Sequence, residues 1–150
     1  MILVGDFVYR REVPEDLSGI LNRLEPALKI RGFGILATLD VARQLREKLG
    51  TSQEDLVILD VCSPRHAHRI LAVHPEAAWL LPCKIVLSHH EGRTRIDLPR
   101  PTELIGVLNP PSGLRGIAWE VEQLLMEAVD EAAGGPTLPT HVPSPSAVTG

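Results

Sequence analysis

The segment from Leu56 to Leu71, LVILDVCSPRHAHRIL, constrains the fold more than any other part of this 150-residue chain. Its first half is almost continuously apolar, which is typical of a short central strand that is covered on at least one face. Ser63 and Pro64 then supply a helix N-cap and a proline at the first helical position. The helix is expected to end near His74, because a proline follows. The segment therefore predicts a buried strand that leads directly into a helix.

Similar patterns predict the other elements. Apolar residues at helical spacing predict helices over residues 15–30, where Pro26 should bend or interrupt the helix, over residues 41–49, and from Leu114 to Val129. Strands are expected over residues 2–12, 33–39, 83–89 and 93–98, with a hairpin turn at Glu91-Gly92 and a short helical piece near 101–107. On the last helix we expect Trp119 in the core and a solvated outer face that carries Glu120, Glu122, Glu127, Asp130 and Glu131.

Length and composition indicate one domain over residues 1–133 and a disordered Pro/Gly/Ser/Thr tail over residues 134–150. A net charge of -4 and an aromatic content of only 3% argue against nucleic-acid binding and against an anionic membrane surface. No apolar run reaches the about 18–20 residues that span a bilayer. The start of the chain lacks the pattern of a signal peptide, so we expect a cytoplasmic protein with reduced cysteines.

The chain has two cysteines, and each lies at the end of a predicted strand. Cys62 precedes a helix N-terminus, with Arg65 and His66 nearby in sequence, and these features would favour its thiolate and lower its pKa. The alternative is a packed thiol, since free cysteine is among the most buried residue types. Cys83 shares a strand face with Ile85 and Leu87, which favours a place in the core.

Whether the two thiols meet depends on how their strands pair. Antiparallel neighbours would place Cys62 and Cys83 at the same end of the sheet, whereas parallel strands would separate them by about 20 Å. The linking residues can span either arrangement. A weak candidate site for zinc, copper or haem iron combines Cys62, His66 and Cys83, although no established metal-binding spacing supports it. Asp60 lies on the same strand face as Cys62 and is a candidate to orient His66 or Arg65.

Three ordered motifs resemble the family known as domain of unknown function 302. They are GFGILATLDVARQLREKLG, LVILDVCSPRHAHRIL and LLPCKIVL, within a family-like core of about residues 32–98. The resemblance implies an α+β two-layer sandwich, with helices on one face of a mainly antiparallel sheet, and a homodimer. It brings no established reaction. Ser63 stands where the family usually has asparagine, so any role of that asparagine is not carried over.

Two functional hypotheses follow from the residues. In the first, Cys62 and Cys83 form a thiol-centred site, supported by His66, Arg65 and Asp60, that binds a soft metal, haem or a sulfur species or takes part in redox exchange. In the second, the protein is a non-catalytic homodimeric binding module and both cysteines are part of its core. The separation of the two sulfurs distinguishes these hypotheses. The sequence does not identify a cofactor, a substrate or an enzyme class.

Overall fold

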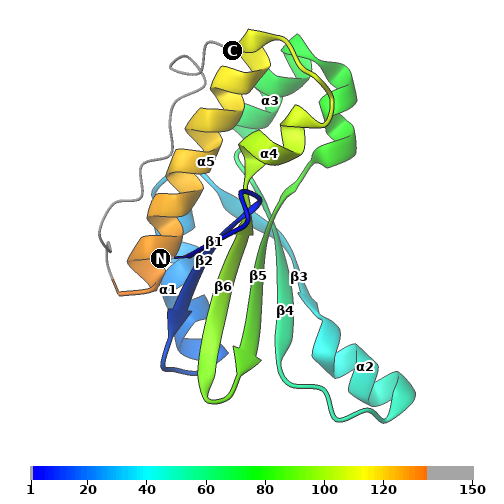
Figure 1. Cartoon of the computed structure of the whole chain (residues 1–150), viewed down its shortest axis with the longest axis vertical. Helices are drawn as coiled ribbons and strands as arrows, with labels where there is room; N and C mark the ends of the chain where they lie inside the picture. The colour runs from blue at the N-terminus through cyan, green and yellow to red at the C-terminus, as the bar shows by residue number, and fades with distance from the viewer. Residues whose placement is uncertain (1, 135–150) are drawn as a thin grey trace.

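The computed structural model describes residues 2–134, so the predicted disordered tail lies outside the described residues from residue 135 onward. Six strands and five α-helices, with one short 3-10 helix, follow one another along the described chain (Figure 1). Their bounds are β1 Ile2–Val4, β2 Val8–Val13, α1 Leu17–Lys29, β3 Gly34–Asp40, α2 Val41–Leu49, β4 Leu56–Cys62, α3 Pro64–Val73, η1 Pro75–Leu80, β5 Cys83–His90, β6 Arg93–Pro99, α4 Pro101–Gly106 and α5 Ser112–Ala132.

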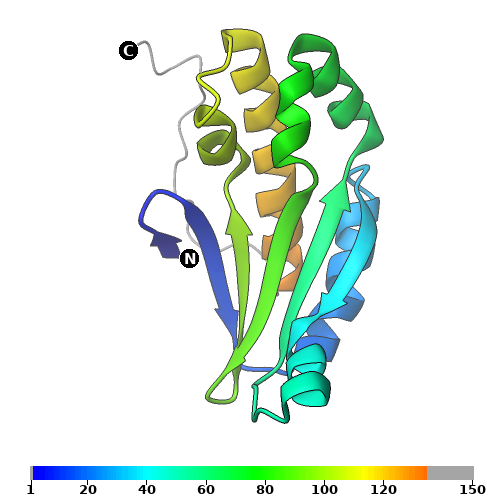
Figure 2. The same ribbon diagram turned by 90° about the vertical axis from the view of Figure 1, so that its right-hand side faces the viewer.

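The six strands form one sheet in the order β1-β2-β6-β5-β4-β3, and every neighbouring pair is antiparallel. Helices α1 and α5 pack against each other and cover one face, while the short helix α2 lies at one end of the sheet, away from them (Figures 1 and 2). This arrangement confirms the predicted α+β fold with helices on one face of an antiparallel sheet. The predicted first strand is divided in two, because a turn at Gly5, with φ of 57°, folds β1 back onto β2.

The main core lies between the sheet and these two helices. On β4 the burial alternates, so that Val57, Leu59 and Val61 point into the core while the residues between them face the open side. Such alternation is expected of an antiparallel sheet with one covered face. Helix α1 continues through Pro26 and ends three residues later, so the predicted interruption is wrong. Pro26 lacks the N–H that would have made one bond within the helix, and the helix ends within the turn that this proline begins.

A second, smaller apolar cluster lies beyond one end of the sheet, and we call it the cap. It consists of α3, η1, α4 and the first residues of α5, which gather above the strands in Figures 1 and 2. Its buried side chains are Ile70, Ala77, Ile105, Leu114, Ile117 and Ala118. The cap closes the end of the sheet at which β4 stops and β5 starts, and this is the end that carries both cysteines.

A buried ion pair ties the cap to the sheet. Glu122 of α5 is fully buried, and its carboxylate accepts hydrogen bonds from the Arg100 guanidinium at 3.3 Å and from the Thr102 hydroxyl at 2.6 Å. Arg100 also donates to the backbone oxygen of Asp6 at 2.6 Å. The prediction that Glu122 lies on a solvated helix face is therefore wrong, because α4 packs over that part of α5.

Two other expectations for α5 also fail. Asp130 is partly buried and accepts hydrogen bonds from the Tyr9 hydroxyl at 2.5 Å and from Arg11 at 2.7 Å. Burial raises the pKa of the Tyr9 hydroxyl, and the neighbouring Asp130 carboxylate adds to this shift, so the phenol stays protonated and donates. Trp119 is half-buried rather than a core residue.

Candidate functional site

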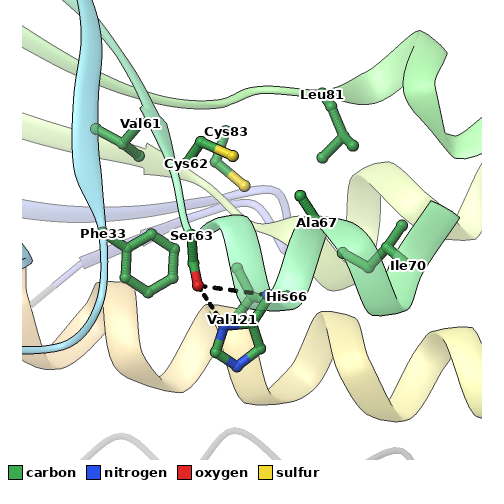
Figure 3. A pocket seen from close by; sticks show the side chains of 10 residues that line it. All are labelled: Phe33, Val61, Cys62, Ser63, His66, Ala67, Ile70, Leu81, Cys83 and Val121. Atoms are coloured by element: carbon green, nitrogen blue, oxygen red, sulfur yellow. Dashed lines mark hydrogen bonds between the residues drawn. The ribbon is translucent and has the colours of Figure 1, made fainter.

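The antiparallel pairing of β4 with β5 brings the two cysteines to the same end of the sheet. Val61 is the Cα partner of Cys83 in this register, so Cys62 lies one residue further along its strand. Strict alternation would place the two side chains on opposite faces, but both strands end here. Figure 3 shows both sulfurs directed toward the same space, and both cysteines line one small cavity. The structure thus resolves the topology that the sequence left open, in favour of neighbouring thiols.

The local sequence positions each thiol. Cys62 ends β4 because Ser63 turns the chain into α3, where the Ser63 hydroxyl caps the helix by accepting from the His66 backbone N–H at 3.4 Å. Cys83 opens β5 directly after the cis peptide bond between Leu81 and Pro82. The predicted helix start and the predicted core face of Cys83 are both confirmed, since Cys83 packs against the main core.

The two thiols share a small cavity between the main core and the cap. Its volume is about 20 Å³, and its other walls are mostly apolar (Figure 3). The lining residues are Phe33, Val61, Cys62, Ser63, His66, Ala67, Ile70, Leu81, Cys83 and Val121. A second cavity of about 30 Å³ shares Ile70, Leu81, Cys83 and Val121 with the first and extends toward α4. Cys83 therefore has unfilled apolar space on two sides.

Burial, rather than the helix N-terminus, dominates the acidity of both thiols. It raises the pKa of Cys62, and it raises the pKa of Cys83 to about 12, with a smaller contribution from the neighbouring Cys62. The expected lowering of the Cys62 pKa is therefore wrong. Arg65 is exposed on α3 and does not line the cavity, so its charge does not offset the loss of solvation. Both cysteines are free thiols that are protonated at neutral pH.

His66 lines the cavity, but both of its ring nitrogens have neighbours other than the sulfurs. Its Nδ1 lies 2.7 Å from the Ser63 hydroxyl, and its Nε2 lies 3.8 Å from a Glu120 carboxylate oxygen that also pairs with Arg69 at 2.6 Å. The ring stacks on Phe33 at 6.0 Å between centroids and lies on the far side of Ser63 from the cysteines in Figure 3. Burial lowers the pKa of His66, so the imidazole is neutral at pH 7.

The structure separates the predicted site residues into two groups. Cys62, Cys83 and His66 line one cavity. Asp60 does not orient His66 or Arg65, because its carboxylate pairs with Lys84 at 2.7 Å across the open face of the sheet. Within residues 2–134, no three or more His, Cys, Asp or Glu side chains are grouped to hold a metal ion, so Cys62, His66 and Cys83 are not arranged as a three-ligand site.

A larger depression, of about 420 Å³, lies at the opposite end of the sheet near the start of β4. His89 and His90 both border it, but their rings have different neighbours. His90 Nε2 lies 3.0 Å from the Ser88 hydroxyl, and His89 Nε2 lies 3.8 Å from Asp16. This divergence follows from adjacent positions on a strand. The two histidines do not form a shared site, so the thiol cavity remains the better candidate.

A family model and a solved structure both match this chain. The family model described as "Domain of unknown function DUF302" matches residues 9–132. The chain belongs to the DUF302 family. A solved structure titled as an uncharacterized conserved protein DUF302 from Bacillus stearothermophilus is 37% identical, with a TM-score of 0.80 over 85% of this chain and 99% of that one. No curated protein matches the chain. The description of the family assigns it no function.

Two features of the cavity were missed at the level of sequence. Phe33 follows a helix stop, and Leu81 precedes Pro82, so both looked like parts of loops and strands rather than walls of a site. The Ser63–His66–Glu120 chain was missed because Glu120 lies 54 residues beyond His66 on a different helix. Only the spacing of Ser63 and His66, three residues apart across a helix start, carries a local signal of this contact.

Within residues 2–134, none of the helices is both long enough and apolar enough to cross a membrane.

Proposed function

We propose that Cys62 and Cys83 act together as a thiol–disulfide exchange pair. One observation carries the proposal: the two cysteines line one small cavity at the end of neighbouring strands. With strands spaced about 4.8 Å apart and a rise of about 3.4 Å per residue, a one-residue offset places the two Cα atoms about 6 Å apart. Disulfides usually join Cα atoms about 4.4–6.8 Å apart, so the pair can close without moving the strands.

Cys62 is the attacking thiol in this proposal. Both thiols are partly buried, but the rise in pKa is large only for Cys83, so Cys62 forms thiolate more readily. The Cys62 thiolate attacks an external disulfide, forms a mixed disulfide and releases one partner thiolate. The Cys83 thiolate then attacks Cys62 Sγ, closes the internal disulfide and releases the second partner thiolate. The two released thiolates take up the two protons that the cysteines gave to solvent.

The raised pKa values decide the kind of exchange. Thiols that are protonated at neutral pH react slowly, and thiolates of high basicity are poor leaving groups, so a closed disulfide would resist reduction. In the cytoplasm, which we propose as the location of the protein, the slow reaction of the protonated thiols with disulfides would keep the pair in the reduced form. The pair is thus suited to donate electrons to an oxidised partner rather than to oxidise one.

Incubation with oxidised glutathione over a range of pH, followed by mass spectrometry, tests the proposal. We expect the wild-type chain to lose the mass of two hydrogens, at a rate that rises steeply above pH 8. Cys83→Ser should accumulate a glutathione adduct on Cys62, because the resolving thiol is absent, while Cys62→Ser should accumulate little. Two free thiols that persist at high pH until the protein is unfolded would sink the proposal.

A second candidate is the non-catalytic homodimer, and the open face of the sheet favours it. Ile58 and Val86 are paired in register on this face and lie between ionic pairs that are satisfied within the chain, such as Arg10 with Asp97 at 2.7 Å. A second copy could cover such a face without leaving unpaired charges. Light scattering on Val86→Asp checks this: a wild-type dimer that becomes a monomer supports it, and a wild-type monomer at high concentration contradicts it.

A further inference from the structure

We propose that the reduced pair also binds one monovalent thiophilic metal ion, such as Cu(I), held between Cys62 Sγ and Cys83 Sγ in two-coordinate geometry. This goes beyond the exchange activity, although it uses the same two thiols. Binding replaces both thiol protons: two thiols and one monovalent cation give a metal bis-thiolate with one negative charge and two protons released to solvent. Neither sulfur changes its oxidation state.

The size and lining of the cavity fit an occupant of atomic size. A volume of about 20 Å³ exceeds the roughly 10–15 Å³ needed for the centre of one water molecule, but leaves little room for additional ligands. Most of the lining side chains other than the thiols are apolar, among them Val61, Ala67 and Leu81 (Figure 3). An apolar shell excludes water from a bound ion, and so it disfavours ions that keep hydration water.

The number and kind of ligands select the ion. Soft thiolates favour Cu(I), whereas a structural zinc site needs four ligands. The described residues offer no group of three or more His, Cys, Asp or Glu side chains at which zinc could bind. His66 is not a further ligand, because its Nδ1 faces the Ser63 hydroxyl at 2.7 Å and its ring lies away from the sulfurs. Two sulfurs alone match a cation that accepts linear coordination.

Burial opposes the single negative charge of the complex, and the start of α3 offsets part of this cost. Cys62 lies two residues before α3, a ten-residue helix, and the positive end of the helix dipole favours an anion at this position. The second cavity, on the other side of Cys83, gives that side chain apolar space in which to adjust when the two sulfurs separate to admit an ion. This adjustment of the Cys83 side chain requires no movement of the strands, whose register is set by the core residues Leu59 and Ile85.

Competition with the Cu(I) chelator bicinchoninate tests the proposal on the full chain. The titration is anaerobic with ascorbate present, so that disulfide formation does not contribute. We expect one Cu(I) per chain, two sulfur neighbours and no nitrogen neighbour by X-ray absorption, and no displacement by excess Zn(II). Cys62→Ser and Cys83→Ser should each weaken the affinity for Cu(I). The loss should exceed the about 10–100-fold that results from mutating a residue that only supports a metal ligand. The matched control His66→Gln should bind as the wild type does.

Three results would overturn the proposal. They are Cu(I) affinity that is unchanged in Cys62→Ser, a loss in His66→Gln as large as that in Cys62→Ser, and tight Zn(II) binding at the same site. If Cys83→Ser fails to fold, Cys62→Ser decides the question alone, since the Cys62 thiol is less deeply desolvated. Failure of exchange with glutathione would leave this result standing, because the titration contains no disulfide.

Discussion

The main core and the cap are built by different means. The main core buries large aliphatic side chains from four strands and two helices in one continuous cluster, and residues such as Leu59, Ile85 and Leu125 have no exposed surface. The cap buries fewer residues, leaves apolar cavities at its border, and is joined to the sheet by the buried pair of Arg100 and Glu122. The comparison teaches that the thiols lie where close packing gives way to looser packing.

The largest expected effect tests the attachment of the cap. Glu122→Ala removes the buried carboxylate from the Arg100 guanidinium, which keeps the partly exposed Glu103 at 3.5 Å, and breaking a buried pair in this way costs about 3–5 kcal/mol of unfolding free energy. Urea unfolding measures the loss. Glu120→Ala on the same helix is the control, because its partly exposed pair with Arg69 should contribute at most about 1 kcal/mol. Equal losses of unfolding free energy in Glu122→Ala and Glu120→Ala would show that the buried pair stabilises the protein no more than the partly exposed pair does.

The next effect compares packing in the two regions directly. Leu125→Ala in the main core and Leu114→Ala in the cap each remove a fully buried side chain, and each should cost about 2–5 kcal/mol. The difference should appear in amide hydrogen exchange. We expect Leu125→Ala to accelerate exchange in the sheet and α1, and Leu114→Ala to accelerate it mainly in α3, η1 and α4. Uniform acceleration by Leu114→Ala would show that the cap is not a separate cooperative unit.

The smallest expected effect is a dependence of stability on pH at the border of the two regions. Burial lowers the pKa of His66 in the folded state below its ordinary value of 6.5, although Glu120 opposes the shift. The unfolded chain therefore binds a proton more readily, so stability is full above about pH 6.5 and falls as the pH drops toward the folded pKa. His66→Gln should flatten this part of the profile of melting temperature against pH. An identical profile in His66→Gln would assign the dependence to other groups.

The main core could be predicted from sequence because its signals are local. The nearly continuous apolar run of β4 and the helical spacing on α5 depend on residues that are close in the chain, and Asp40 and Ser63 cap their helices as expected. The resemblance to a known family supplied the sheet arrangement that these local patterns left open. The burial of Glu122 could not be predicted, because it depends on Arg100 and Thr102 from a segment about twenty residues away.

The site could be predicted only in part for the same reason. The position of Cys62 before a helix is written in the sequence, and so is the core face of Cys83. Their pKa values are not, because desolvation depends on Leu81, Val121 and other side chains that the fold brings over the thiols. The charged residues near Cys62 in sequence predicted a lowered pKa for its thiol, but Arg65 lies on the exposed surface of α3.

The pairing of Val61 with Cys83 makes the cysteine pair a reporter of strand registry. If β5 slid by one residue against β4, its core residues would turn to the open face and the relation between the sulfurs would change with them. A short crosslinker that bridges both thiols should therefore trap only chains in which this pair of central strands has aligned correctly. Added at increasing times during refolding, such a reagent would time the moment at which the middle of the sheet acquires its native alignment.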